Sequence, residues 1–225
     1  MEQNQKIDLS KYENHLGKKH QLIRLVWGIT WAIGASWLPR SMGSGWKRLL
    51  LIAFGAKMGR NSNVYSSAKV YYPANLVMGD NTCLPSDVDC YNVAPVILED
   101  NVTVSQGTYL CTASHDITDP MHPLITAPIV LKDQSWVGAR AFIGMGVSVG
   151  QGAFVGASAS VYKDVEEWAV VGGNPAKVLK QRVINASKSM KYNLMGGMIL
   201  KFELGGCGLE YRDYAGYRQE RRIAA

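Results

Sequence analysis

A six-residue recurrence of apolar residues is the feature of this sequence that most restricts its fold. From residue 131 an apolar side chain returns at every sixth position, and a small or β-branched residue follows four positions after each. Neither the 3.6-residue period of a helix nor the two-residue period of a strand produces this spacing. It is typical of a solenoid built from short strands and turns. The apolar members are Leu131, Val137, Ile143, Val149, Val155 and Val161.

The same phase runs through the first half of the repeat, where the apolar positions come in threes. Trios start at Met58, Met78 and Leu98, twenty residues apart, so each coil carries two extra residues near a proline such as Pro73 or Pro95. Three six-residue units close one triangular coil of about 18 residues, and coils stack at about 4.8 Å. The sequence therefore predicts an all-β solenoid, a parallel β-helix of about five coils, and not a sandwich of short strands.

One interruption breaks the repeat between Leu110 and Leu131. Residues 113–128, ASHDITDPMHPLITAP, carry two histidines, two aspartates and three prolines. A loop expelled from a regular solenoid is a common place for function. We therefore expect three regions, namely an N-terminal helical, apolar segment (1–57), the β-helix domain (58–182) with an expelled loop at 112–128, and a C-terminal extension of unknown role (183–225).

Composition and charge exclude several kinds of protein. With 47% apolar residues in 225, the chain can bury a substantial core and is not intrinsically disordered. The net charge of +6 combines an acidic middle with basic ends, and no basic stripe interleaved with aromatics is present, so we expect no nucleic-acid partner. The four cysteines lack zinc-ligand spacing, so we expect no metal. No signal peptide is evident, which favours a cytoplasmic protein.

Three segments accompany the repeat. They are Ser114-His115-Asp116 in the loop, WVGARAFIGMGVSVGQGAFVGASASVYKDV at 136–165, and GGNPAKVLKQR at 172–182. Together with the hexads they resemble the hexapeptide-repeat O-acetyltransferases, above all those of colanic acid biosynthesis in bacterial exopolysaccharide clusters. The likeness covers roughly residues 45–182. It implies a left-handed β-helix, a homotrimer with sites between subunits, and acetyl-CoA as co-substrate.

The resemblance also implies roles for particular residues. His115 is the general base, a task that suits imidazole because its pKa lies near working pH. The residues implied to bind acetyl-CoA are Trp136, Gly138, Ala139, Ala157, Lys163, Lys177 and Lys180. Among them, the amide of Ala139 is the implied donor to the oxyanion, while a subunit contact is the alternative role of Trp136. Lysines at 177 and 180 stand where related enzymes often carry arginine, and they meet phosphate as point charges.

The acceptor side of the site has fewer signals. Asn92 resembles an acceptor-binding asparagine of related sugar acetyltransferases. Asp116 either orients the imidazole or contacts the acceptor, or it caps the loop. His122 is either a second site residue or part of the loop surface.

An apolar segment precedes the solenoid at 22–38, LIRLVWGITWAIGASWL, with basic residues on both sides. It is shorter than the ~20 residues of a spanning helix. It packs on the first coil or between subunits, where it would also cap the open strand edges of the solenoid, or it lies at a membrane surface with its tryptophans at headgroup depth. A membrane-spanning helix is the third alternative. Peripheral contact with the inner face of the membrane would suit a lipid-linked acceptor.

Three classes of function remain. The first is an acyltransferase that moves an acetyl group from acetyl-CoA to a sugar hydroxyl in exopolysaccharide or its lipid-linked precursor, by direct attack, since no serine or cysteine is placed as a nucleophile. The second is a catalytically silent β-helix assembly protein. The third is a zinc lyase of the carbonic anhydrase kind, which needs three converging histidines, and only His115 and His122 lie in the solenoid region.

Overall fold

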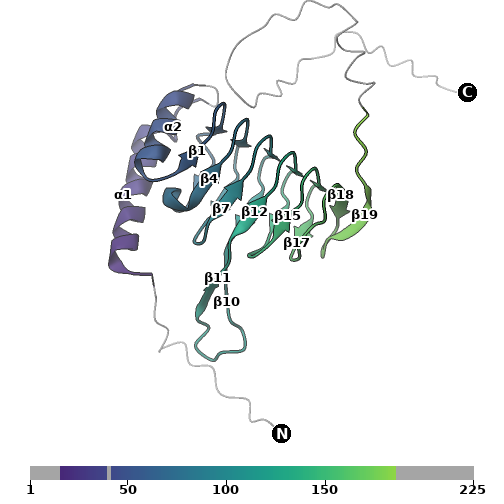
Figure 1. The fold of residues 1–225 in the computed structure, drawn as a ribbon. Helices are drawn as coiled ribbons and strands as arrows, with labels where there is room; N and C mark the ends of the chain where they lie inside the picture. The colour runs from purple at the N-terminus through teal and green to yellow at the C-terminus, as the bar shows by residue number, and fades with distance from the viewer. Residues whose placement is uncertain (1–15, 40–41, 186–225) are drawn as a thin grey trace, which may run out of the picture.

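The chain winds into a parallel β-solenoid with two helices packed across its N-terminal end (Figure 1). The computed structural model describes residues 16–39 and 42–185. The strands of the solenoid form three sheets, one for each side of a triangular prism. The all-β solenoid predicted from the six-residue repeat is confirmed.

Each regular coil contributes one strand to each of the three sheets. Sheet A contains β1 (Lys57–Met58), β4 (Leu76–Met78), β7 (Val96–Leu98), β12 (Ile129–Leu131) and β15 (Ser148–Val149). Sheet B contains β2 (Asn63–Val64), β5 (Cys83–Leu84), β8 (Thr103–Val104), β13 (Trp136–Val137), β16 (Phe154–Val155), β18 (Ala169–Gly172) and β19 (Lys177–Gln181). Sheet C contains β3 (Lys69–Val70), β6 (Asp89–Tyr91), β9 (Tyr109–Cys111), β14 (Phe142–Ile143) and β17 (Ser160–Val161). Neighbouring strands are parallel except β18 and β19, which are antiparallel.

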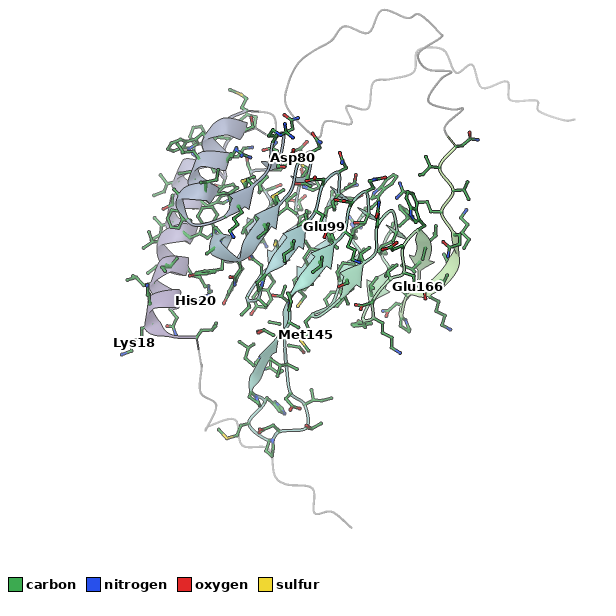
Figure 2. All side chains as sticks on the ribbon, viewed as in Figure 1. Lys18, His20, Asp80, Glu99, Met145 and Glu166 are labelled. Atoms are coloured by element: carbon green, nitrogen blue, oxygen red, sulfur yellow. The ribbon has the colours of Figure 1, made fainter. Side chains whose placement is uncertain are left out.

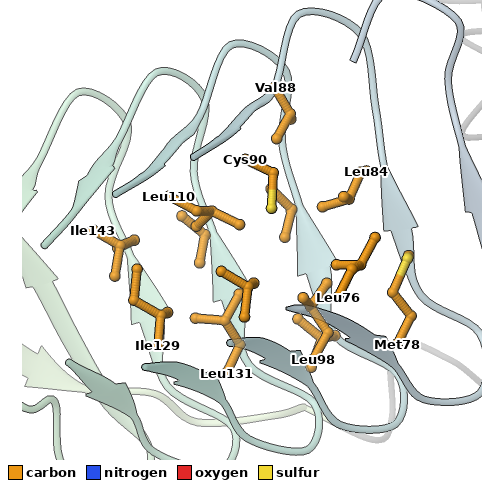
Figure 3. Packing of buried hydrophobic residues seen from close by; sticks show 14 of the residues in the cluster. Leu76, Met78, Leu84, Val88, Cys90, Leu98, Leu110, Ile129, Leu131 and Ile143 are labelled. Atoms are coloured by element: carbon orange, nitrogen blue, oxygen red, sulfur yellow. The ribbon is translucent and has the colours of Figure 1, made fainter. Parts of the chain in front are cut away.

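Successive coils are in register, so equivalent positions of the repeat lie above one another. In sheet A, Met78 pairs with Leu98 and Leu98 pairs with Leu131. In sheet C, Cys90 pairs with Leu110. All five side chains point into the prism and are buried (Figure 3). Because each buried apolar side chain of this size contributes about 1.5–3 kcal/mol, the stacked hexads are the main source of cohesion between coils.

The number of turns differs slightly from the expected five. Sheet B contains six parallel strands, from β2 to β18. The last coil is short, since Val149 bridges to Val165 and Val155 pairs with Val171, each sixteen residues on. Beyond residue 166 the chain therefore continues to wind without the six-residue spacing. For this reason the spacing predicts five coils and not the sixth.

The corners of the prism explain two features of the sequence. Asn61, Asn81 and Asn101 have φ of 55°, 57° and 57°, a left-handed conformation that asparagine tolerates. Their side chains form a ladder in which each Nδ2 donates to the Oδ1 of the next at 3.1 Å. At another corner a 3₁₀ turn at Pro73–Asn75 accommodates extra residues of the longer coils, as the sequence predicted.

Two helices, α1 (Lys18–Gly34) and α2 (Ser44–Ala53), cover the first coils. Two indoles attach α1 to the solenoid, because Trp27 Nε1 donates to the Val70 carbonyl at 2.7 Å and Trp31 Nε1 to the Ser66 carbonyl at 3.2 Å. On α2, Leu51 is fully buried against the end of the prism. The segment at 22–38 thus packs on the first coils, one of the arrangements expected for it. Neither helix is long and apolar enough to cross a membrane in the ranges that the structure describes.

The ends of the chain lie partly outside the described residues. The described residues do not include 1–15, which belong to the expected N-terminal segment 1–57. They also do not include 186–225, which make up most of the expected extension 183–225. The domain boundaries at 57/58 and 182/183 therefore stay predictions.

Candidate active site

A β-hairpin leaves the solenoid within the expected loop 112–128. Its strands, β10 (Ala113–His115) and β11 (Leu124–Thr126), pair antiparallel. The hairpin leaves after β9 of sheet C, returns before β12 of sheet A, and projects away from the prism (Figure 1). It therefore presents its residues beyond the corner between sheets C and A.

His115 lies at the end of β10 with an exposed side chain. Its Nδ1 is 2.6 Å from the carbonyl oxygen of His122 across the hairpin. Because a carbonyl oxygen can only accept a hydrogen bond, Nδ1 carries the proton, and Nε2 carries the lone pair in the neutral ring. The hairpin thus holds the imidazole in the tautomer that a general base requires.

Turns stabilised by aspartates shape the tip of the hairpin. The Asp116 Oδ1 accepts hydrogen bonds from the Thr118 hydroxyl at 2.6 Å and its N–H at 2.9 Å. These bonds lower the pKa of the Asp116 carboxyl. The N–H of His122 donates to the Asp119 carbonyl at 2.9 Å, and His122 adopts a φ of 46°. Asp116 therefore caps the loop, one of the three roles left open for it, and the turns that follow aim the His122 carbonyl at His115.

Asn92, expected to bind the acceptor, is fully buried at the corner between sheets C and A. Its Oδ1 accepts from the Tyr72 N–H at 3.0 Å, and its Nδ2 donates to the Tyr72 carbonyl at 2.8 Å. Both polar atoms thus join two successive coils. This arrangement does not support acceptor binding by Asn92, because the side chain is fully buried between the two coils.

Trp136 lies on the outer surface of sheet B, on β13. Its side chain is 39% exposed, and its Nε1 donates to the Ser105 hydroxyl at 3.0 Å. The indole packs edge to face on Phe154, with ring centroids 5.1 Å apart. These contacts hold the indole in one orientation on the outer surface. Sequence reasoning missed Ser105, because it lies 31 residues earlier and no motif marks it.

The corner after β13 brings backbone groups of two coils close together. A Cβ at Gly138 would lie 2.7 Å from both the Ala157 nitrogen and the Val155 carbonyl oxygen, so this close stacking requires glycine. The Ala139 carbonyl accepts from the Ser158 N–H at 2.8 Å, whereas the Ala139 N–H donates to no group among the described residues. An N–H left unused at a rigid corner is suited to stabilise an oxyanion.

Two of the expected lysines lie on β19, and both are exposed. Lys180 is opposite Val170, Val170 pairs with Phe154, and Phe154 pairs with Trp136. Trp136 and Lys180 therefore occupy one row of sheet B, about 14 Å apart at three strand spacings. Lys177 is opposite Gly172 on the same pair of strands. Sheet B and its edge thus bring most of the expected coenzyme-binding residues together.

The structure does not bring His115 to this group within one chain. Ala139 and Ala157 lie at the corner between sheets B and C, whereas the hairpin leaves the corner between sheets C and A. Lys163, which follows β17, also lies at the corner between sheets C and A. A whole side of the prism separates the two corners, and proton transfer needs heavy atoms about 3 Å apart. A single chain therefore does not assemble a complete site.

Potential metal ligands do not converge. Among residues 16–39 and 42–185, no three His, Cys, Asp or Glu side chains form a group that could hold a metal ion. Cys83 and Cys90 are buried cysteines, and burial raises the pKa of the Cys90 thiol. A zinc lyase would therefore lack its ligand set in the described part of the chain.

No family model matches the chain, but individual proteins do. The putative colanic acid biosynthesis acetyltransferase WcaF of Escherichia coli (strain K12) is 35% identical over 161 residues, 72% of this chain and 87% of that protein. A hexapeptide-repeat acetyltransferase of Vibrio cholerae superposes with a TM-score of 0.68 at 25% identity, covering 75% of this chain and 95% of that one. Its complex with acetyl coenzyme A gives a TM-score of 0.68 at 24% identity, covering 77% and 94%.

The fold and these likenesses define a left-handed β-helix acyltransferase. The chain belongs to the hexapeptide-repeat acetyltransferase family. The resemblance that the hexads and the segment around His115 implied is confirmed, and so is the fold class apart from the number of coils.

Proposed function

We propose that this protein is an acetyl-CoA-dependent O-acetyltransferase that acts on a sugar hydroxyl of a bacterial exopolysaccharide or its lipid-linked precursor. The colanic acid biosynthesis acetyltransferase and the acetyl coenzyme A complex among its relatives support this activity. The observation that carries the proposal is the hydrogen bond from Nδ1 of His115 to the His122 carbonyl, because it leaves Nε2 as the proton acceptor.

His115 acts as general base in the proposed reaction. Its Nε2 takes the proton of the sugar hydroxyl while the hydroxyl oxygen attacks the thioester carbonyl carbon. A C–O bond forms, the C–S bond breaks, and the imidazolium gives the proton to the departing sulfur. The Ala139 N–H stabilises the negative charge that develops on the carbonyl oxygen. General base catalysis of this kind contributes roughly 10²–10⁴-fold to the rate.

Acetyl-CoA supplies an activated acetyl thioester, and the outer surface of sheet B fits such a ligand. Trp136 offers a partly exposed indole to the apolar arm, and at the next corner the Ala139 N–H donates to no group among the described residues. The ammonium groups of Lys177 and Lys180 are exposed on β19 and attract the phosphates as point charges.

We further infer a homotrimer with one site at each subunit boundary. His115 and Ala139 lie on opposite edges of sheet C, so rotation about a threefold axis can place one edge of each subunit beside the other edge of its neighbour. Each site would then combine the hairpin of one subunit with the sheet B corner of the next. Lys163 lies on the same edge of sheet C as the hairpin. It would therefore reach the phosphates of acetyl-CoA across the subunit boundary.

The acceptor is expected beside the hairpin. Asp116 lies next to His115 and is partly exposed, so its carboxylate is a proposed acceptor contact in addition to capping the loop. We expect the reaction to take place in the cytoplasm, at the inner face of the membrane when the acceptor is lipid-linked.

Transfer of radiolabelled acetyl groups to de-O-acetylated exopolysaccharide oligosaccharides tests this function. We expect alkali-labile label on the saccharide and an equal amount of free coenzyme A thiol. The absence of labelled product with free, nucleotide-linked and lipid-linked saccharides would contradict the proposal. A His115→Ala variant that still gains thermal stability with acetyl-CoA but transfers no label is the matched control.

A further inference from the structure

The outer side of α1 is apolar and is not covered by the solenoid. The inner side buries Trp27, Trp31 and Ala35 against the first coils. The opposite side carries large apolar side chains that are 45–72% exposed. They are Leu22, Leu25, Val26, Ile29, Ile33 and, just beyond the helix, Trp37. A helix that is apolar on both sides requires two apolar environments, and the solenoid supplies one.

The exposed side of α2 continues this surface. Met42, Trp46, Leu49 and Ile52 are 43–59% exposed. Trp46 Nε1 donates to the Gly34 carbonyl at the end of α1 at 2.9 Å, so the exposed sides of the two helices meet there. These four residues and the six on α1 form what we call the outer helical face. Figure 1 shows α1 at the outer edge of the molecule. Contiguous apolar surfaces of this kind mark interaction sites.

Polar groups on the outer helical face already have partners inside the helix. The Thr30 hydroxyl, the Ser36 hydroxyl and the Trp37 Nε1 each donate to the carbonyl four residues earlier, at 2.8, 2.8 and 2.6 Å. A donor that is satisfied within its own helix carries little penalty when it leaves water. The outer helical face is therefore suited to a water-poor environment.

The charge near the outer helical face favours a membrane over a second copy of the chain as its binding partner. No aspartate or glutamate occurs between Glu13 and Asp80, whereas nine lysines and arginines do. Lys18 and Lys19 are exposed at the start of α1, and Lys18 points away from the solenoid in Figure 2. Two copies that met through this face would bring cations against cations, which disfavours that contact. Anionic lipid headgroups instead attract the exposed cations at the start of α1, Lys18 and Lys19.

We propose that the outer helical face binds the surface of an anionic bilayer. α1 and α2 lie in the plane of the interface, with their apolar side chains among the upper acyl chains and Lys18 and Lys19 among the headgroups. The attachment is peripheral and brings the enzyme to the surface that presents a lipid-linked saccharide. That last link rests on the proposed function, whereas the binding itself does not require activity.

Sedimentation of the full chain with lipid vesicles tests the proposal. We expect binding to phosphatidylglycerol–phosphatidylethanolamine vesicles, weakened by salt, and at least about tenfold weaker binding to phosphatidylcholine vesicles. The double variant Ile29→Asp, Ile33→Asp should lower the partition coefficient by roughly 10–100-fold or more. The double variant Val183→Asp, Ile184→Asp is the matched control, because it adds the same charge at apolar residues that are 85% and 60% exposed away from α1 and α2, and it should bind as wild type does.

Other outcomes decide against the proposal or separate it from the proposed function. Failure of the wild type to bind anionic vesicles would overturn it, as would wild-type binding by the double variant with an unchanged melting temperature. If the double variant changes the subunit number by light scattering while the wild type ignores vesicles, a second copy covers the face and the proposal is wrong. Lost vesicle binding with retained acetyl transfer to a soluble saccharide supports it independently of catalysis.

Discussion

The Nδ1 atom of His115 and the carbonyl oxygen of His122 lie 2.6 Å apart across the hairpin that leaves the solenoid. A backbone carbonyl therefore orients the imidazole. The position of that carbonyl depends on the φ of 46° at His122 and on its N–H bond to Asp119, not on the His122 side chain.

Substitutions at the two histidines should therefore have very different effects. His115→Ala is expected to lower turnover by roughly 10²–10⁴-fold with little change in acetyl-CoA affinity. His122→Asn should stay near wild type, because asparagine tolerates positive φ and retains the carbonyl. Steady-state kinetics of acetyl transfer to an oligosaccharide measure both. Wild-type turnover in His115→Ala would exclude the imidazole as the base.

A site shared between subunits predicts complementation between inactive variants. His115→Ala removes the base, while the double variant Trp136→Ala, Lys180→Glu damages the coenzyme slot. If the two groups act across a subunit boundary, trimers of mixed composition regain some intact sites, about a quarter of the total for equal random mixing. Co-expression with two purification tags and an activity assay provide the measurement. Mixed trimers without activity would place both groups in one subunit.

The corner at Gly138 should tolerate no side chain. Gly138→Ala places a Cβ 2.7 Å from backbone atoms of the next coil, and we expect a loss of roughly 1–3 kcal/mol of stability from this overpacking. Gly156→Ala is the matched control one coil later, where the nearest atom would be the Val171 carbonyl oxygen at 3.2 Å. Thermal melting should show a clearly larger decrease for Gly138→Ala. Equal decreases would mean that the coils can move apart at this corner.

Lys47 on α2 predicts a pH dependence of stability. It is fully buried, with Nζ 3.4 Å from the Ser66 hydroxyl, and desolvation lowers its pKa from the usual 10.5 despite an opposing contribution from Cys83. Between the folded pKa and 10.5 the unfolded chain binds more protons at this group, so its contribution to stability rises with pH in that window.

Removal of the ammonium group should flatten this dependence. In Lys47→Met the melting temperature should rise less between pH 7 and about 10 than in the wild type. Lys57→Met is the control, because Lys57 is exposed on β1 and should leave the wild-type slope unchanged. The same slope in all three proteins would contradict the assignment to Lys47.

Much of the fold could be predicted because the interior of a narrow prism requires an apolar side chain at every sixth residue. Leu110 and Ile143 are neighbours in register, and each must be apolar whatever surrounds the molecule. The sixth turn could not be predicted in this way, because the coil that ends at Val165 is shorter and does not keep the six-residue spacing.

The site could be predicted in part. The position of His115 in an interrupted repeat pointed to the loop that forms the hairpin, and the resemblance pointed to Trp136. The burial of Asn92 depends on Tyr72 in the preceding coil, and the bond of Trp136 to Ser105 crosses to another coil. No local pattern records such contacts between coils. Residue type alone therefore suggested a role for Asn92 that its surroundings do not support.

The pairing beneath the hairpin has a wider consequence. Leu98 pairs directly with Leu131, as though the intervening excursion were absent. The pairing of β7 with β12 in the solenoid therefore does not depend on β10 and β11. During evolution such an insertion can therefore be replaced, lengthened or shortened. Related proteins can then differ in the reaction they catalyse while the solenoid stays the same.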